Sequence, residues 1–177
     1  MKIRRLCVRI VCAASVACLL LLGSSFIPAA ADAATIVALG ASNTFGKGVA
    51  RNQAYPAQLE AILRARGHDV RVINAGINGD TTGGMLRRLD RAVPKGTGVV
   101  ILQPGGNDRR KGVEGDRAAN ISQIQSRLNA RVIRVIMLEN GMLRGYARQP
   151  DGQHLTPEGY RMLAESLAAQ VASALGR

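Results

Sequence analysis

The chain has 177 residues, a formal net charge of +12 and only 3% aromatic residues. This length allows one domain whose core is large enough to fold without disulfides or metal ions. Basic chains often bind nucleic acid, but with so few aromatic side chains for base stacking we expect no nucleic-acid partner. We expect a solvated basic surface instead, with weak contact to anionic lipid or envelope polymer as the alternative.

Residues 1–33 have the features of a secretory signal peptide. The basic residues near its start are Lys2, Arg4, Arg5 and Arg9. An apolar run over 10–22 follows, and then a segment of small residues in which Ala31 and Ala33 suit the −3 and −1 positions of a cleavage site. At about 13 residues the run is short for a membrane span, which needs roughly 20. We therefore expect a periplasmic or secreted protein, with an uncleaved anchor as the alternative.

All three cysteines, Cys7, Cys12 and Cys18, lie in this leader. Cleavage would leave no disulfide, thiolate metal site or cysteine nucleophile. Lipidation of Cys18 fits poorly, because the apolar run continues beyond it. Residues 34–177 are expected to form a single domain. Removing four basic residues and one acidic residue from the totals of 24 and 12 gives it a net charge of +9.

Short apolar runs alternate with helical patterns in this domain. The candidate strands cover residues 35–39, 70–74, 98–103 and 132–138, and the candidate helices cover 55–66, 82–92, 117–129 and 157–175. The strand runs are rich in Val and Ile without a solvent-facing alternation, which is typical of a parallel sheet covered on both faces. Thr156 and Pro157 suit the N-cap and first position of the last helix. The alternation predicts a doubly wound α/β fold with right-handed crossovers.

Ligands of such sheets bind at the carboxyl ends of the strands, so the loops there are the candidate site. Ser42 follows the first strand and can either cap a turn or act as a nucleophile, if a base takes its proton. The two histidines, His68 and His154, are the only bases of suitable type. His68 precedes the second strand and so belongs at the opposite edge of the sheet. The last helix can bring His154 to the edge where Ser42 lies.

Asp151 stands three residues before His154, where it can accept a hydrogen bond from Nδ1 and orient the ring as a general base. The same spacing also fits an exposed turn and a helix cap. The backbone N–H groups of Ser42 and Gly79 and the side-chain amide of Asn107 could converge on an oxyanion, although each residue also suits a turn or a cap. Neither a phosphate-loop spacing nor a cluster of metal ligands is evident, so we expect no phosphate loop and no metal site.

Four blocks resemble the SGNH (GDSL-type) hydrolases, in the order in which that family carries them. They are GASNT around Ser42, NGDT with Gly79, GGND with Asn107, and a D-x-x-H block from Asp151 to His154. The likeness is greatest to the bacterial group of acyl-CoA thioesterase I, lysophospholipase L1 and arylesterase. It extends over roughly residues 35–175, nearly the whole predicted domain.

This resemblance implies a flavodoxin-like three-layer α/β/α sandwich. It also implies that Ser42 is the nucleophile and an oxyanion donor, Gly79 and Asn107 the other donors, His154 the base and Asp151 its orienting partner. The expected reaction is hydrolysis of a small or medium acyl ester or thioester through an acyl-enzyme, without a cofactor, by a monomer. Two alternatives stay open: a carbohydrate O-deacetylase of the same mechanism, and a non-catalytic protein that binds an anionic ligand.

The chain departs from the family pattern in two places. Ala41 stands where the family has the aspartate of G-D-S, which removes a loop carboxylate but no catalytic group. Only about a dozen residues separate Leu138 from Asp151, where larger members insert a helix and a strand. We therefore expect a sheet of four strands, or five if residues 143–147 add an edge, and an open acyl groove. Met142 and Leu143 are candidates to line that groove or to join the core.

Overall fold

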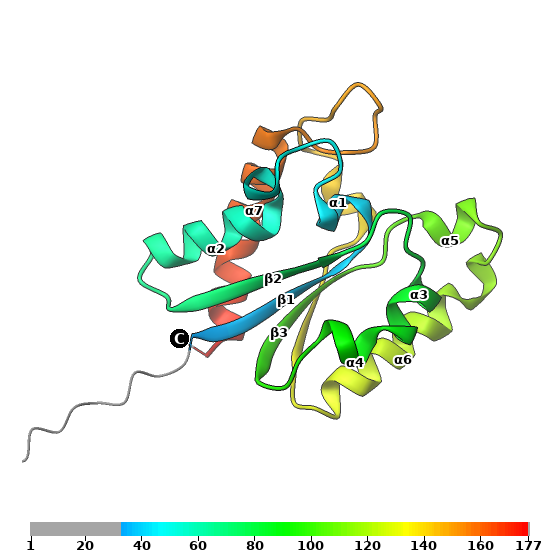
Figure 1. Cartoon of the computed structure of the whole chain (residues 1–177), viewed down its shortest axis with the longest axis horizontal. Coiled ribbons are helices and arrows are strands. Elements are labelled where there is room, and N and C mark those ends of the chain that lie inside the picture. Colours follow the sequence, from blue (N-terminus) through cyan, green and yellow to red (C-terminus); the bar gives the residue numbers. More distant parts are fainter. Residues whose placement is uncertain (1–32, 177) are drawn as a thin grey trace, which may run out of the picture. The chain divides into compact units, whose positions relative to one another are not determined.

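A four-stranded parallel sheet forms the centre of the computed structural model, which describes residues 33–176 (Figure 1). The strands are β1 (Ala34–Gly40), β2 (Val70–Gly76), β3 (Thr97–Gln103) and β4 (Arg134–Met137). Their order is β2-β1-β3-β4, with Ile36 of β1 opposite Val72 of β2 and Val99 of β3. The chain leaves β1 toward one side for β2 and crosses to the other side for β3. The topological switch point therefore lies between β1 and β3, where ligands of such sheets bind.

Helices of different lengths connect the strands. Before β3 they are α1 (Ser42–Phe45), η1 (Arg51–Gln53), α2 (Tyr55–Ala65), α3 (Thr82–Arg87) and α4 (Leu89–Ala92). After β3 they are α5 (Asn107–Arg110), η2 (Glu114–Asp116), α6 (Arg117–Asn129), η3 (Asn140–Leu143) and α7 (Pro157–Ala174). The predicted cap of α7 is present, because Thr156 Oγ1 accepts the N–H of Gly159 at 3.1 Å.

Two apolar cores lie on opposite faces of the sheet. Ile36 and Ala38 of β1 pack with residues of α2 and α7, whereas Val37 and Leu39 pack with residues of α3, α4 and α6. Figure 1 shows the same division, with α2 and α7 on one side of the strands and α3, α4 and α6 on the other. Successive residues of a strand point to opposite faces, so an uninterrupted apolar run fills both cores. The predicted three-layer α/β/α arrangement is confirmed.

Two element predictions need correction. The strand expected at 132–138 begins only at Arg134, because Val132 lies 90% exposed in the turn after α6 with φ 58°. The helix expected at 82–92 is interrupted at Arg88, whose φ of −99° and ψ of 7° separate α3 from α4. Residues 143–147 complete η3 and a turn and add no edge strand, so of the two predicted sizes the described sheet has the smaller, four strands. The signal-peptide prediction falls almost entirely on residues 1–32, outside the described part.

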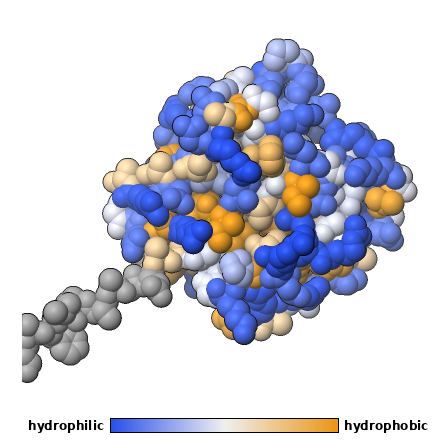
Figure 2. All heavy atoms as spheres, viewed as in Figure 1, coloured by the Kyte–Doolittle hydropathy of each residue, from blue (hydrophilic) through white to orange (hydrophobic). Residues whose placement is uncertain are grey.

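No helix within residues 33–176 is long and apolar enough to cross a membrane. Figure 2 shows a face that is largely hydrophilic, with hydrophobic residues in separate groups. Isolated apolar groups of this kind are ordinary on folded proteins. Charged and polar groups therefore dominate this face.

Candidate active site

A hollow of about 260 Å³ lies at the carboxyl edge of the sheet, between the segments that follow β1 and β3. Ser42, Asn107 and His154 all line it. Asp151 contacts His154, while Gly79 is not among the residues that line the hollow. Three of the five predicted site residues therefore share one hollow, and the other two stand beside it.

Ser42 begins α1 in a tight turn directly after β1. The backbone N–H of Phe45 donates to the Ala41 carbonyl at 2.9 Å, and the N–H of Gly46 donates to the Ser42 carbonyl at 3.0 Å. Gly40 is required for this turn, because a Cβ there would lie 2.9 Å from the backbone oxygen of Gln103. The turn leaves the Ser42 side chain half-buried at the hollow.

His154 is almost fully buried, at 5% exposure, and its ring contacts the carboxylate of Asp151. Nδ1 lies 2.5 Å from Oδ2, and the backbone N–H groups of His154 and Gln153 donate to Oδ1 at 3.0 and 2.9 Å. Together the His154 N–H, the ring and the Gln153 N–H hold the pKa of Asp151 well below its usual range. A carboxylate only accepts, so Nδ1 carries the proton and Nε2 of the neutral ring is left as an acceptor.

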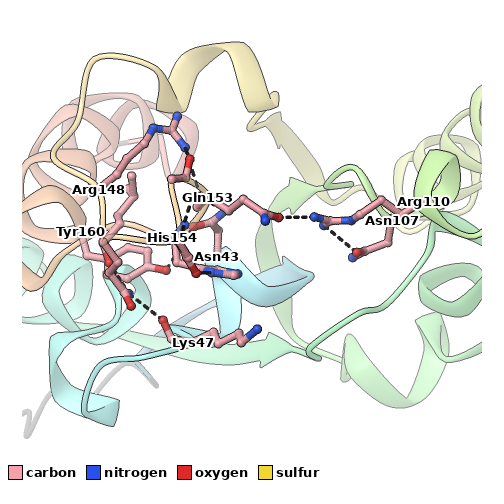
Figure 3. Close-up of polar contacts among 12 residues, drawn as sticks. Asn43, Lys47, Asn107, Arg110, Arg148, Gln153, His154 and Tyr160 are labelled. Carbon is pink, nitrogen blue, oxygen red and sulfur yellow. Dashed lines mark hydrogen bonds and ion pairs between the residues drawn. The ribbon is translucent and has the colours of Figure 1, made fainter.

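The segment that carries His154 is held on several sides (Figure 3). The guanidinium of Arg148 donates to the carbonyl of Gln153 at 3.2 Å. The backbone N–H of Gln149 donates to the His154 carbonyl at 2.8 Å, and its side-chain Nε2 donates to the Lys47 carbonyl at 2.8 Å. These contacts fix the ring position relative to the α1 region.

Asn43 links the serine turn to the histidine segment. Its Nδ2 donates to the Gln153 carbonyl at 3.3 Å, and its Oδ1 accepts from the hydroxyl of Tyr160 at 3.1 Å. Burial raises the pKa of Tyr160 to about 12, so this hydroxyl stays protonated and remains a donor. No hydrogen bond among the described residues joins the Ser42 hydroxyl to the His154 ring. In enzymes without substrate such bonds are often long and shorten only when the substrate binds.

The side chain of Asn107 is fixed beside the turn that contains Gly79. Its Nδ2 donates to the Asp80 carbonyl at 2.7 Å, and its Oδ1 accepts from Arg110 at 2.8 Å. The second Nδ2 hydrogen remains available for a ligand. Within residues 33–176 no hydrogen bond uses the backbone N–H of Ser42 or Gly79, so these donors are also available.

Two carboxylates that sequence reasoning did not assign, the partly buried Asp80 and the buried Asp108, hold the site loops together. Asp80 pairs with Arg88 at 2.8 Å, and Arg88 also donates to the Gly40 carbonyl at 3.1 Å, which joins the loops after β1 and β2. Asp108 accepts from the N–H and hydroxyl of Thr82 at 3.1 and 2.5 Å, which joins the loops after β2 and β3. Both aspartates stand in the NGDT and GGND blocks, where acidic residues beside glycines were a usable signal. Nothing in the sequence singled out Arg88.

Two further side chains connect distant parts of the site. Gln103, the last residue of β3, is 1% exposed and accepts the backbone N–H of Ala41 at 3.3 Å. Arg110 binds Gln153 as well as Asn107, and so connects the segment after β3 to the segment that carries His154 (Figure 3). Neither residue carried a signal in the sequence.

The remaining sequence candidates have different surroundings. Leu143 is buried and lines the hollow, whereas Met142 is 46% exposed and lies outside the lining. His68 precedes β2, at the amino end of the sheet. Within residues 33–176, the His, Cys, Asp and Glu side chains form no group of three that could hold a metal ion.

The profile of the GDSL-like Lipase/Acylhydrolase family matches residues 38–174. The chain belongs to this family. Among its relatives is the esterase TesA of Pseudomonas aeruginosa, 31% identical over 110 residues that cover 61% of this chain and 55% of the relative. The chain thus spans little more than half the length of this curated relative.

Solved structures of esterases are also similar to this chain. The psychrotrophic esterase EstA of Pseudoalteromonas sp. superposes with a TM-score of 0.71 at 19% identity, covering 81% of this chain and 99% of EstA. The SGNH-hydrolase family esterase AlinE4 has a TM-score of 0.61 at 27% identity, covering 83% of this chain and 99% of AlinE4. The likeness to EstA shows the fold alone. The predicted resemblance to the SGNH hydrolases and the predicted α/β fold are confirmed.

Proposed function

We propose that this protein is an exported serine hydrolase that cleaves small or medium acyl esters or thioesters through an acyl-enzyme. The observation that carries the proposal is the buried imidazole of His154, which is held by Asp151 at 2.5 Å and lines the same hollow as Ser42. A base, its orienting carboxylate and a nucleophile are the groups that serine catalysis requires.

In this mechanism the Ser42 oxygen attacks the ester carbonyl while Nε2 of His154 takes the hydroxyl proton. Asp151 stabilises the resulting imidazolium through Nδ1–H. Collapse of the tetrahedral intermediate breaks the carbonyl bond to the leaving alkoxide or thiolate, which receives the proton from Nε2. Water then repeats the sequence on the acyl-enzyme, releases the carboxylic acid and restores the serine. The lowered pKa of Asp151 keeps its carboxylate ionised in mild acid, so it remains an acceptor for Nδ1–H.

The negative charge of the intermediate needs donors that are in place before the reaction. The N–H of Ser42, the N–H of Gly79 and the free amide hydrogen of Asn107 are the proposed donors. Asn107 supports this role, because contacts with Asp80 and Arg110 orient its amide in the absence of substrate. Removal of one such donor usually costs about 100- to 1000-fold in kcat.

The hollow favours short acyl chains. It is about 260 Å³ in volume, and Leu143 supplies a buried apolar wall. Much of the remaining lining is polar or charged, which suits a small acyl group better than a long hydrocarbon.

Hydrolysis of p-nitrophenyl acetate and butyrate by the purified chain tests the proposal. Ser42→Ala should reduce kcat by several orders of magnitude, since the triad acts as a unit. Ser122→Ala, at an exposed position of α6, is the matched control and should hydrolyse both esters as the wild type does. Equal rates for wild type and Ser42→Ala would refute the proposal. If the chain binds an ester or another anionic ligand but shows no turnover, and a fluorophosphonate probe fails to label Ser42, a non-catalytic binding protein is favoured.

Export rests on the leader in residues 1–33 and is proposed separately. Expression of the full chain in a bacterium, followed by mass spectrometry of the periplasmic fraction, should yield a chain that begins at Ala34. Full-length protein retained inside the cells would contradict export without affecting the catalytic proposal.

A further inference from the structure

The hollow around Ser42 is lined by cations and by no carboxylate. Four arginines contribute to its walls: Arg109, Arg110, Arg144 and Arg148. Lys111 adds a fifth positive charge on the oxyanion side, since its Nζ lies 4.0 Å from where a Cβ would stand on Gly79. Cations that line a cleft raise the local concentration of anionic ligands.

Two of these arginines are already engaged. Arg110 binds the side chains of Asn107 and Gln153, and Arg148 donates to the carbonyls of Gln153 and Leu143. Their guanidinium groups hold the walls together, so their donors are partly used. They still contribute charge to the hollow.

Arg109 and Arg144 differ from this pair. Both are exposed, and within residues 33–176 neither side chain makes a hydrogen bond or an ion pair. They come from different segments, α5 and the turn after η3. Two guanidinium groups that converge on one hollow from separate segments can bind an anion without breaking any existing contact.

Of the two hollows that Arg109 lines, only the one with the serine has an excess of positive charge. A neighbouring hollow shares Arg109 but also contains Glu114 and Glu139, and its second arginine, Arg117, is paired with Glu139 at 3.3 Å. Its charges therefore balance. A third hollow also has a positive excess, from Arg87, Arg88 and Arg91 against Asp80, but neither Ser42 nor His154 lines it. Only the hollow around Ser42 therefore combines an excess of cations with the candidate nucleophile and base.

We infer that this enzyme prefers esters that carry a negative charge, a carboxylate or a phosphate type of group, which Arg109 and Arg144 bind while the ester reaches Ser42. This inference rests on the proposed esterase function and specifies its substrate class. The two arginines act in specificity, and the chemical steps remain those of the serine and the histidine.

The test compares acetyl esters that differ in charge but have leaving phenols of similar reactivity. The neutral substrate is 4-acetoxyphenylacetamide, and the anionic ones are 4-acetoxyphenylacetate and 4-acetoxybenzylphosphonate. We expect kcat/KM to be about fivefold to tenfold higher for the anions at low salt, as two exposed ion pairs provide. Because salt screens exposed charges, this ratio should approach one at about 0.5 M NaCl. The carboxylate and phosphonate arms show which anion is preferred.

The double variant R109Q/R144Q should lose most of the anionic preference. The matched control is R66Q/K95Q, which removes two exposed cations near the amino ends of β2 and β3 and should keep the preference. Equal kcat/KM for neutral and anionic esters at low salt, or a preference that survives in R109Q/R144Q, overturns the inference. If the wild type cleaves no ester, the proposed function fails first. Cleavage of the neutral ester without a charge preference leaves that function intact and rejects only this inference.

Discussion

Replacing Gln103 by methionine tests how the nucleophile turn is held. The side chain of Gln103 is 1% exposed, and its Oε1 accepts from the Ala41 backbone N–H at 3.3 Å and from Thr44 Oγ1 at 3.4 Å. Its Nε2 donates to Asn140 Oδ1 at 3.0 Å. Methionine keeps the length and fills the same space but provides only a weak acceptor. The residue next to Ala41 is Ser42, so the change acts directly on the turn that presents the serine.

The loss of stability in Gln103→Met follows from the polar groups that lose their hydrogen-bond partner. The Ala41 N–H is buried and loses its acceptor, which typically costs about 1–3 kcal/mol. The hydroxyl of Thr44 also lies 3.4 Å from the Tyr55 hydroxyl, so it keeps a partner. Asn140 is exposed and can bond to water. For a chain of this size the expected loss corresponds to a fall in Tm of roughly 3–10 °C.

Thermal unfolding and ester hydrolysis should be measured on Gln103→Met together. Beyond the fall in Tm, we expect kcat on p-nitrophenyl acetate to fall by about tenfold with a smaller change in KM, since a displaced serine impairs attack more than binding. Gln123→Met, at an exposed position of α6, is the matched control. If Gln103→Met unfolds and turns over as the wild type does, the reasoning about this contact is wrong.

Three further changes test other contacts of the site. Asp151→Asn should lower kcat/KM by roughly three to four orders of magnitude, because the amide no longer holds the tautomer of His154; unchanged kinetics would remove Asp151 from the triad. Arg110→Met should lower kcat by about tenfold, because the Asn107 amide, the proposed oxyanion donor, loses the contact that orients it. An equal effect on KM alone would point to substrate binding instead. Gly84→Ala should destabilise the fold by about 1–3 kcal/mol in urea unfolding, since its Cβ would overlap Oδ1 of Asp80; wild-type stability would show that this carboxylate moves freely.

The sheet was predictable because its strands are buried on both faces. Continuous Val and Ile runs have few other interpretations when helical segments separate them, and β1 to β3 extend at most two residues beyond the predicted runs. The errors occur where tertiary contacts override local pattern. The break at Arg88 is an example, since its guanidinium binds Asp80 and the Gly40 carbonyl, 48 residues away in sequence. Helical periodicity contains no information about such a contact.

The residues of the candidate site likewise divide into those that the sequence identified and those that only the fold brings together. The contact between Asp151 and His154 is local, so its spacing could be read directly, and the structure shows it. Its catalytic role stays a prediction. Gln103 and Arg110 could not be identified, because their partners lie 62 and 43 residues away and glutamine or arginine after a strand has no specific meaning. Sequence motifs thus identify groups suited to the chemistry, while the groups that position them depend on the fold.

The departure at Ala41 acquires a physical meaning from these contacts. The turn at Ala41 is fixed by the side chain of Gln103 and by the Phe45 N–H, so its geometry does not depend on the aspartate that the family has there. What changes is charge: the hollow beside Ser42 has no carboxylate in its lining, and its charged side chains are arginines. An aspartate at this buried position would repel an anionic substrate and cancel part of the positive potential. Alanine at position 41 is therefore consistent with a site that selects anionic esters.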